Sequence, residues 1–311
     1  MPNSESTKVV LGYILICIIW GSTWLAIKIG LESIPPFLGA AVRFLLAAII
    51  MATVVAVKKI PIPKHPLAIR LYILVGSCTF SLGYAFVYWG QQFVPSALAS
   101  ILFGTFPFFV AALSWFVYKS EYITVIKAVG IIIGFIGVVV IFSEDVTYHI
   151  GEASTLGMGA LIIAAIIQAF ASVTVKKYGY EISTFALITV GMAIGTCILF
   201  IISIATEDWS VTVIDANAIG SVLYLATFGS IVTFGTMFWL LKRIEAVILS
   251  LSAFITPIIA IILGIFVAGE EFTTQIFLGS ALVLLGILIA NLQGLLILLK
   301  RKKSALSHSE P

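Results

Sequence analysis

Apolar residues occur in ten long runs, separated by short polar segments. A helix needs about 20 apolar residues to cross the roughly 30 Å hydrocarbon core of a bilayer. The runs lack the alternation of apolar and polar residues that the strands of a membrane barrel require. The pattern therefore predicts ten transmembrane helices, near residues 9–31, 37–57, 71–93, 97–118, 123–142, 156–175, 184–205, 217–241, 246–268 and 275–299.

The composition supports this interpretation. Hydrophobic residues make up 61% of the chain and charged residues 10%, against roughly 45–50% and 25% in typical globular proteins. So few charges cannot cover a water-soluble surface. The connections are too short for a soluble domain, and none holds the glycine-rich phosphate loop of an ATP-hydrolysing transporter. The sequence therefore predicts an all-α polytopic membrane protein.

Lysines and arginines outside the runs fall on one side of the membrane when both termini are placed in the cytoplasm. The two exceptions, Lys28 and Arg43, lie inside the first two helices near their outer ends. The outer loops carry acidic residues instead. Because basic loops stay in the cytoplasm, we expect an integral inner- or plasma-membrane protein with ten spans and both termini cytoplasmic.

The two halves of the chain repeat each other. A shift of 150 residues places Pro107 on Pro257, and a shift of 148 places Lys28 on Lys176. Five helices per half is an odd number, so the halves have opposite orientations in the membrane. Such inverted repeats are typical of secondary transporters, although some channels also contain repeats. The predicted units are two inverted five-helix repeats at 1–149 and 150–299, followed by a basic cytoplasmic tail at 300–311.

Four segments carry a family resemblance: WGSTWLAIK at 20–28, PFLGAAVRFLLAA at 36–48, the unit at 96–141 and its repetition at 249–290. Together they resemble the EamA-type branch of the drug/metabolite transporter superfamily. The resemblance implies a ten-helix inverted-repeat transporter that moves small metabolites by alternating access, often exporting amino acids or related compounds. It also implies that helices 1, 3, 4, 6, 8 and 9 surround the central cavity. The second half has no arginine that matches Arg43, and the sixth helix lacks the tryptophan common there.

Two prolines, Pro107 and Pro257, stand near the middle of their spans. Proline removes the hydrogen bond to the carbonyl four residues back and bends the helix. A freed carbonyl inside a membrane must find another partner or line a wet cavity. The kinks are interpreted either as hinges that shape a cavity or as static bends.

A polar stripe follows the third helix at spacings of three and four residues, which places its members on one face. It consists of Ser77, Ser81, Tyr84, Tyr88 and Gln91. Polar groups in lipid are costly, so the stripe is expected to point into the bundle. It either forms a cavity wall of hydroxyls and aromatic edges or packs helices together.

Large aromatic residues also stand at the middle of the first helix, and an amide and a hydroxyl occupy the matching positions of the sixth. Such a set suits a pocket that stacks on a ligand and fixes its polar end, with core packing as the alternative. The predicted substrate-binding residues are Trp20, Thr23, Trp24, Tyr84, Tyr88, Ser100, Gln168, Ser172, Phe234 and Ser250.

Arg43 lies about seven residues inside the second helix, roughly 10 Å deep at 1.5 Å per residue. A cation at that depth should pair with an acid, a carbonyl or a substrate carboxylate. Glu32 is the nearest acid by sequence, and it shares a helix face with Lys28. The alternative for both cations is a structural tie at the outer rim, or snorkelling. Glu121 and Glu271 are expected to cap loops at opposite faces.

Some absences narrow the function. All carboxylates map to loops, tails or helix ends, so the acid expected of a proton antiporter for organic cations is missing. Lys28 and Arg43 are too few to hold a multiply anionic substrate. No catalytic or metal-ligating group converges at depth. The glycine pairs Gly130/Gly134 and Gly191/Gly195 fit the small-xxx-small packing motif.

The sequence therefore predicts an alternating-access carrier, not an enzyme, that releases small neutral or zwitterionic metabolites, with amino acids as the first candidates. We expect no cofactor, no metal and no nucleic acid. The expected partners are a small-molecule substrate and the lipid bilayer, and the expected state is a monomer or weak homo-oligomer. The alternatives are an exporter of amphipathic drugs or lipids, a ligand-gated pore or receptor, and a purely structural membrane partner.

Overall fold

The computed structural model describes residues 4–116, 124–148, 152–241, 243–244 and 252–307, and every element in these ranges is helical. The helices are α1 (Ser4–Leu31), α2 (Pro36–Val57), α3 (Pro66–Leu74), η1 (Val75–Gly83), α4 (Tyr84–Gln91), α5 (Ser96–Phe103), α6 (Phe106–Phe116), α7 (Val125–Tyr148), α8 (Glu152–Tyr178), α9 (Thr184–Thr206), η2 (Trp209–Val211), α10 (Ala216–Ala226), η3 (Thr227–Val232), α11 (Thr233–Leu241), α13 (Ser252–Phe266) and α14 (Thr274–Ser307).

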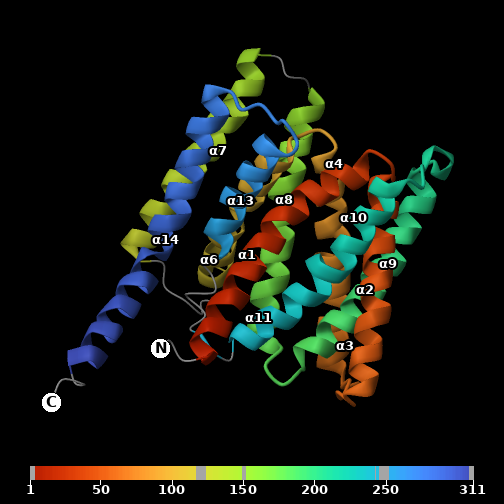
Figure 1. Ribbon diagram of the computed structural model, residues 1–311, viewed down its shortest axis with the longest axis horizontal. Coiled ribbons are helices and arrows are strands. Elements are labelled where there is room, and N and C mark those ends of the chain that lie inside the picture. The colour runs from red at the N-terminus through yellow and green to blue at the C-terminus, as the bar shows by residue number, and fades with distance from the viewer. Residues whose placement is uncertain (1–3, 117–123, 149–151, 242, 245–251, 308–311) are drawn as a thin grey trace.

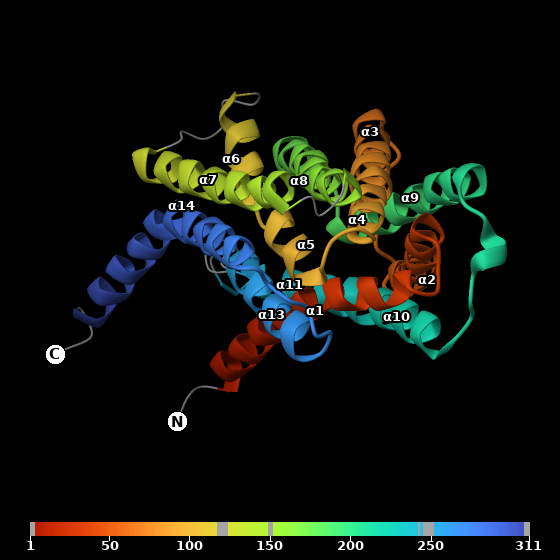
Figure 2. The same cartoon turned by 90° about the horizontal axis from the view of Figure 1, so that it is seen from above.

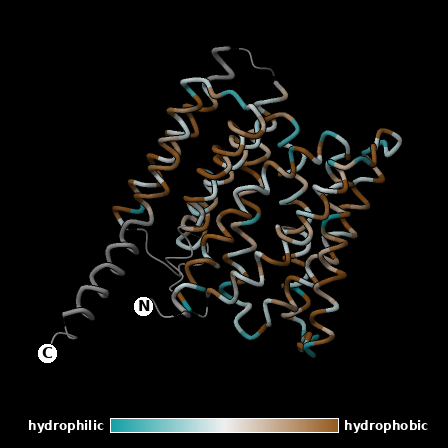
Figure 3. Tube along the Cα trace, viewed as in Figure 1, coloured by the Kyte–Doolittle hydropathy of each residue, from teal (hydrophilic) through white to brown (hydrophobic). Residues whose placement is uncertain are grey.

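Eight helical segments within the described residues are long and apolar enough to cross a membrane. Two shorter apolar helices, Phe254–Phe266 and Thr274–Ala290, correspond to the ninth and tenth expected spans. Hydrophobic residues run along the helices, whereas hydrophilic residues gather at their ends and in the connections (Figure 3). The predicted all-α polytopic membrane protein is confirmed in this coarser form.

The helices form a bundle, with α7 and α14 side by side at one edge of it (Figures 1 and 2). The start of α1 and the end of α14 lie at the same end of this bundle (Figure 1). Glycines let α7 and α14 approach closely: a Cβ at Gly130 would lie 2.6 Å from the Gly286 carbonyl oxygen, and one at Gly137 would lie 2.6 Å from that of Gly279. Gly134 packs against the Phe108 ring of α6, so the predicted packing role of Gly130 and Gly134 is confirmed.

Three of the expected spans, 71–93, 97–118 and 217–241, are not continuous α-helices. The span 97–118 divides into α5 and α6 at Gly104 and Thr105, and Pro107 is the second residue of α6. The Gly104 N–H still donates to the Ser100 carbonyl, four residues back. The Thr105 N–H donates to the Leu102 carbonyl, only three residues back, so the chain turns more tightly there. The bend predicted at Pro107 is thus a break just before it. Pro257, in contrast, lies inside the continuous helix α13.

The expected helices 71–93 and 217–241 each contain a π-helical segment, η1 and η3. In η3, hydroxyls donate to carbonyls five residues back: Ser230 Oγ to Leu225 at 3.0 Å and Thr233 Oγ1 to Phe228 at 2.6 Å. Each hydroxyl therefore gives a carbonyl at or beside the widened turn a side-chain donor. Such segments often occur at functional sites, and neither was predicted from the sequence.

Candidate substrate site

The most unusual buried group of the described residues is the guanidinium of Arg43 in α2, whose side chain is 2% exposed. Its Cζ lies 4.9 Å from the centre of the Tyr84 ring and 5.0 Å from that of Phe44. Nη1 donates one long hydrogen bond, 3.5 Å, to the Tyr88 hydroxyl. Nε has no hydrogen-bond partner. The cation is therefore held mainly by aromatic faces.

Elements from both halves of the sequence surround this cation. On one side, Phe44 packs edge-on against Phe80 of η1 at 5.3 Å and against Tyr84 of α4 at 4.7 Å. On the other side lies Gly229 of η3, where an added Cβ would be 3.5 Å from Arg43 Nη2. Arg43 thus lies where the two halves meet, next to η3, while η1 reaches its neighbour Phe44 through Phe80.

The groups that act on the Arg43 guanidinium are the phenols of Tyr84 and Tyr88, with no carboxylate of the described residues among them. Glu32, the nearest candidate acid by sequence, is not among these groups, since Glu32 is exposed and Arg43 is enclosed. Snorkelling to the outer rim is wrong for Arg43, because its side chain ends inside the bundle.

Lys28 has the structural role that was one of its two alternatives. Its ammonium donates to the carbonyls of Gln91, Gln92 and Val94 at 3.3–3.4 Å, at the end of α4. A cation is favourable there because the last carbonyls of a helix carry partial negative charge. The Gln91 amide donates in turn to the Trp24 carbonyl, so Lys28 and Gln91 tie α1 to α4.

Several predicted pocket residues do meet around Arg43. Tyr84 and Tyr88 contact it directly. Gln168 of α8 lies against Gly83, the residue before Tyr84, where an added Cβ would be 2.8 Å from Gln168 Cγ. Thr23 of α1 lies against Gly229 on the opposite side. The five residues of the polar stripe on the third helix are all buried or half-buried, which confirms that the stripe points into the bundle.

The other predicted pocket residues are not brought to this cluster. Trp24 packs against Phe103, with ring centres 5.4 Å apart, and Trp20 joins a separate apolar cluster around Ile16 and Leu240. Phe234 is half-buried against the main core. Ser100 is buried and its hydroxyl has no partner, Ser172 is exposed, and Ser250 lies outside the described residues.

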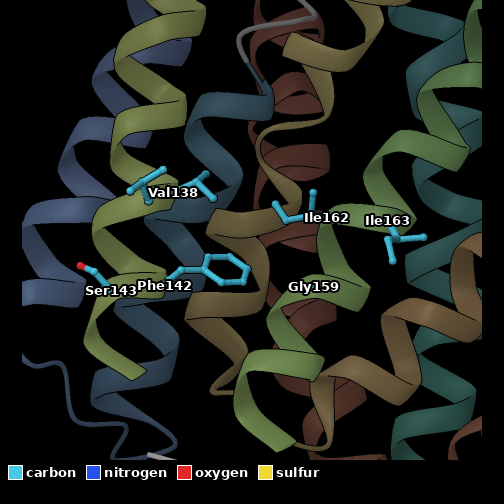
Figure 4. A pocket seen from close by; sticks show the side chains of 7 residues that line it. Val138, Phe142, Ser143, Gly159, Ile162 and Ile163 are labelled. Atoms are coloured by element: carbon cyan, nitrogen blue, oxygen red, sulfur yellow. The ribbon is translucent and has the colours of Figure 1, made fainter. Parts of the chain in front are cut away.

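An apolar hollow of about 570 Å³ lies elsewhere, between α7 and α8 (Figure 4). Hydrocarbon side chains line it except at Ser143 and Gly159. Val139 and Ile163 at its mouth are exposed on the outer surface of the bundle. An open hollow with so apolar a lining does not suit a polar solute.

Two carboxylates that sequence reasoning missed close one end of the bundle. Glu207, just after α9, accepts from the N–H groups of Phe37 and Leu38 at 2.6 and 2.9 Å. Glu270, after α13, accepts from those of Ser96 and Ala97 at 2.6 and 3.0 Å. Each carboxylate caps the start of a helix from the other half, where unpaired N–H groups favour an anion.

The predicted loop cap Glu271 is therefore wrong by one residue. A signal in the sequence identifies Glu270: it stands nine residues before Gly279, as Glu121 stands nine before Gly130. Glu121 itself lies outside the described residues.

Further bonds between the halves lie near this acidic end. Ser33 donates to Asp215 at 2.9 Å, and the Val213 N–H donates to the Ser33 carbonyl at 2.9 Å. Hydrogen bonds from the Ala218 N–H and from Ser33 hold the pKa of Asp215 below its usual value. Ser221 donates to the Ala26 carbonyl at 2.7 Å. The described structure is thus tied together at the acidic end.

With this geometry established, the chain can be compared with known proteins. The model of the EamA-like transporter family matches residues 7–143 and again residues 155–292. This chain belongs to the EamA-like transporter family. The resemblance seen in the sequence motifs is confirmed, and the chain is an integral membrane protein of a transporter family.

Individual relatives agree with the family. The chain is 30% identical to a Bacillus subtilis protein named uncharacterized transporter YoaV, over 90% of this chain and 95% of that protein. It is also 30% identical to the Escherichia coli K12 protein named uncharacterized inner membrane transporter YedA, over 88% of each. A solved crystal structure shares the fold, with a TM-score of 0.65 and 17% identity over 92% of this chain and 97% of that one.

Proposed function

We propose that this EamA-family transporter is an alternating-access carrier for small neutral or zwitterionic metabolites, amino acids first among them. The observation that supports alternation best is the unequal closure of the two ends. Carboxylates of one half hold helix starts of the other at the acidic end. Toward the opposite end, Ser172 is exposed on α8.

The position of Ser172 on α8 indicates which side of the helix is exposed there. It is nine residues from Ile163, which at 100° per residue places it on the opposite side of α8. Ile163 is 44% exposed on the surface that faces the lipid. Exposure on the inward side of the same helix favours an entrance from the end that carries the chain termini. In the proposed cycle, the ties at the acidic end break when that entrance closes.

The proposed architecture is two inverted five-helix halves, 1–149 and 150–299, with ten spans, a basic tail at 300–311 and both termini cytoplasmic. Two separate matches to one family model support the repeat. The crossed glycine contacts support opposite orientations, because Gly130 meets Gly286 while Gly137 meets Gly279. The carrier would act as a monomer or weak homo-oligomer in the inner or plasma membrane.

The interior supports a small solute with polar and apolar parts. Several buried hydroxyls of the described residues have no hydrogen-bond partner, an expensive arrangement unless a ligand or water uses them. These buried hydroxyls belong to Ser81, Ser96, Ser100, Thr196 and Ser280. Lys28 is bound by carbonyls, so Arg43 is the one enclosed cation of the described spans that remains for a charged group.

The test is counterflow in proteoliposomes loaded with an unlabelled amino-acid mixture and given single labelled amino acids outside. A carrier accumulates label transiently, with saturation, and loses the signal when the internal mixture is omitted. A pore instead equilibrates label whether or not solute is inside, and that result would refute the carrier. No uptake by correctly inserted protein would exclude amino acids and move the screen to amphipathic drugs and lipids.

A further inference from the structure

The environment of Arg43 is incomplete as a purely structural site. A guanidinium offers five N–H donors in a planar fork, and burial of a charge is costly unless the charge is paired and hydrogen-bonded. Here the described residues supply one hydrogen bond of 3.5 Å, two aromatic faces and nothing for Nε. Lys28 shows the contrast, since three carbonyls satisfy its ammonium.

The location adds a second observation. Arg43 lies where α2 of the first half faces η3 of the second, and a Cβ added at Gly229 of η3 would lie 3.5 Å from Nη2. A change in the distance between the halves therefore changes what faces this nitrogen. An ordinary structural anchor in such a seam would have an acidic partner on the other half, and none of the described residues provides one.

We propose that Arg43 binds the carboxylate of the transported solute, so that the solute class is monocarboxylates, neutral amino acids included. A planar carboxylate accepts two parallel hydrogen bonds from a guanidinium, a geometry that Lys cannot reproduce. In the present conformation, Tyr84, Phe44 and Tyr88 contact the guanidinium. In the loaded carrier, the carboxylate replaces the long hydrogen bond to Tyr88 and also accepts a hydrogen bond from Nε. This inference rests on the proposed carrier function.

The first test compares matched solutes in the counterflow assay: L-phenylalanine, its amide and 3-phenyllactate, with L-leucine, leucinamide and 2-hydroxyisocaproate as the aliphatic set. Acids and hydroxy acids should exchange, because both keep the carboxylate. The amides should bind at least about tenfold more weakly, since a hydrogen bond to a charged group is worth about 1.5–3 kcal/mol and 1.4 kcal/mol is tenfold. Equal transport of acids and amides would keep the carrier and overturn the role of Arg43.

The second test compares variants. Arg43→Gln should weaken the binding of the acids about tenfold or more and abolish the preference for acids over amides. Arg43→Lys should keep part of the preference, because it keeps the charge without the planar fork. Lys28→Gln is the matched control: it removes a nearby cation whose partners are carbonyls, so it should lower stability and leave the preference for acids. Gel filtration separates misfolded variants, and Tyr88→Phe provides a milder perturbation of the same site.

A third measurement remains decisive when no solute of the set is transported. Sodium acetate and sodium lactate, compared with sodium chloride at equal ionic strength, should raise the Tm of the purified wild-type protein because a ligand that binds only the folded state stabilises it. The rise should be absent in Arg43→Gln and present in Lys28→Gln. If counterflow fails but the Tm rises depend on Arg43 in this way, the proposed substrates are refuted and the anion site is supported. Equal Tm rises in the wild type and in Arg43→Gln would refute the anion site.

Discussion

Two helix contacts that correspond in the sequence repeat are built very differently. Helix α9 packs against η1 through glycines: a Cβ at Gly195 would lie 2.5 Å from Phe80 Cβ, and one at Gly76 would lie 2.6 Å from Ile194 Cβ. Helix α2 meets η3 through the Arg43 guanidinium, whose Nη2 would lie 3.5 Å from a Cβ added at Gly229. The first contact is tight and apolar, whereas the second encloses a charge.

The difference shows where the two halves have diverged. A shift of 148 residues, which places Lys28 on Lys176, also places Arg43 on Gly191. Gly191 belongs to the tight contact, so the position that packs helices in the second half carries a cation in the first. Close packing suits a rigid unit, and an incompletely satisfied cation suits a site that changes partners. If Arg43 binds the solute as proposed, α9 with η1 is the rigid contact and α2 with η3 is the binding contact.

The largest effect is expected from Gly195→Val. Its Cβ would meet both the side chain and the backbone of Phe80, at 2.5 and 2.9 Å, and overpacking of this kind costs about 1–3 kcal/mol or more. We expect a lower yield of monodisperse protein and a Tm several degrees lower in detergent. Gly220→Val is the matched control, because nothing lies within 4 Å of the Cβ at Gly220. Equal losses in both variants would contradict the close α9–η1 contact.

The next effect concerns the end of the molecule where α9 and α2 are joined. Glu207→Ala should destabilise the fold by about 1–2 kcal/mol, the range for loss of a helix N-terminal cap, since the start of α2 loses the acceptor for Phe37 and Leu38. Glu270→Ala should do the same at α5. The control is Glu271→Ala, which is exposed and should stay within about 0.5 kcal/mol. Thermal melts that rank Glu271→Ala with the other two would overturn the assignment of the caps.

The sequence predicts the membrane fold well because the signal is repeated along each helix. Long apolar runs fix which segments span, and regular glycine spacing identified the contacts at Gly130 and Gly191. The π-helical segments were not predicted, because the extra residue depends on hydroxyls that satisfy displaced carbonyls after packing, as Ser230 does. No periodicity in the sequence encodes that choice.

The candidate site was only partly predictable. Arg43, Tyr84 and Tyr88 were recognised as buried polar residues, yet their meeting depends on how α2 rotates against α4. Trp20 and Trp24 are four residues apart and were expected to share a pocket, but they pack in different clusters. Burial rules say that a side chain points inward, whereas tertiary packing decides which neighbour it finds.

Two Gly→Ala variants test whether the α2–η3 contact affects the affinity for solute and the α9–η1 contact affects stability. Gly229→Ala adds a Cβ 3.0 Å from Thr23 Cγ2 and 3.5 Å from Arg43 Nη2, so small shifts accommodate it. We expect a stability change within about 1 kcal/mol but a weaker apparent affinity for transported solute. Gly191→Ala adds a Cβ 2.8 Å from Val75 Cγ1 and should show the reverse, with lower stability and unchanged affinity. Identical behaviour of the two variants in melts and counterflow would remove the functional contrast between the contacts.

The smallest expected effect lies at the starts of the two π-containing spans, where the cap differs. His65 Nδ1 accepts from the Ala68 N–H at 3.3 Å, and the matching Asp215 accepts from Ala218 at 2.7 Å. Bonds from Ala218 and Ser33 lower the pKa of Asp215, so the carboxylate favours the folded state above its unfolded pKa of about 3.9. This contribution is lost as the pH falls through the lower folded pKa.

Asp215→Asn keeps a good cap residue and removes only the charge. Its Tm should therefore be slightly below that of the wild type at pH 7, and the two should converge as the pH falls from about 3.9 through the lower folded pKa, where the folded wild-type carboxyl becomes neutral as well. Ser33→Ala should shrink the pH-dependent difference, because it removes one of the hydrogen bonds that lower the pKa of Asp215. Melts of the three proteins from pH 7 to pH 3 measure this directly. A difference that stays constant over that range would show that the charge of Asp215 contributes nothing to the stability of the start of α10.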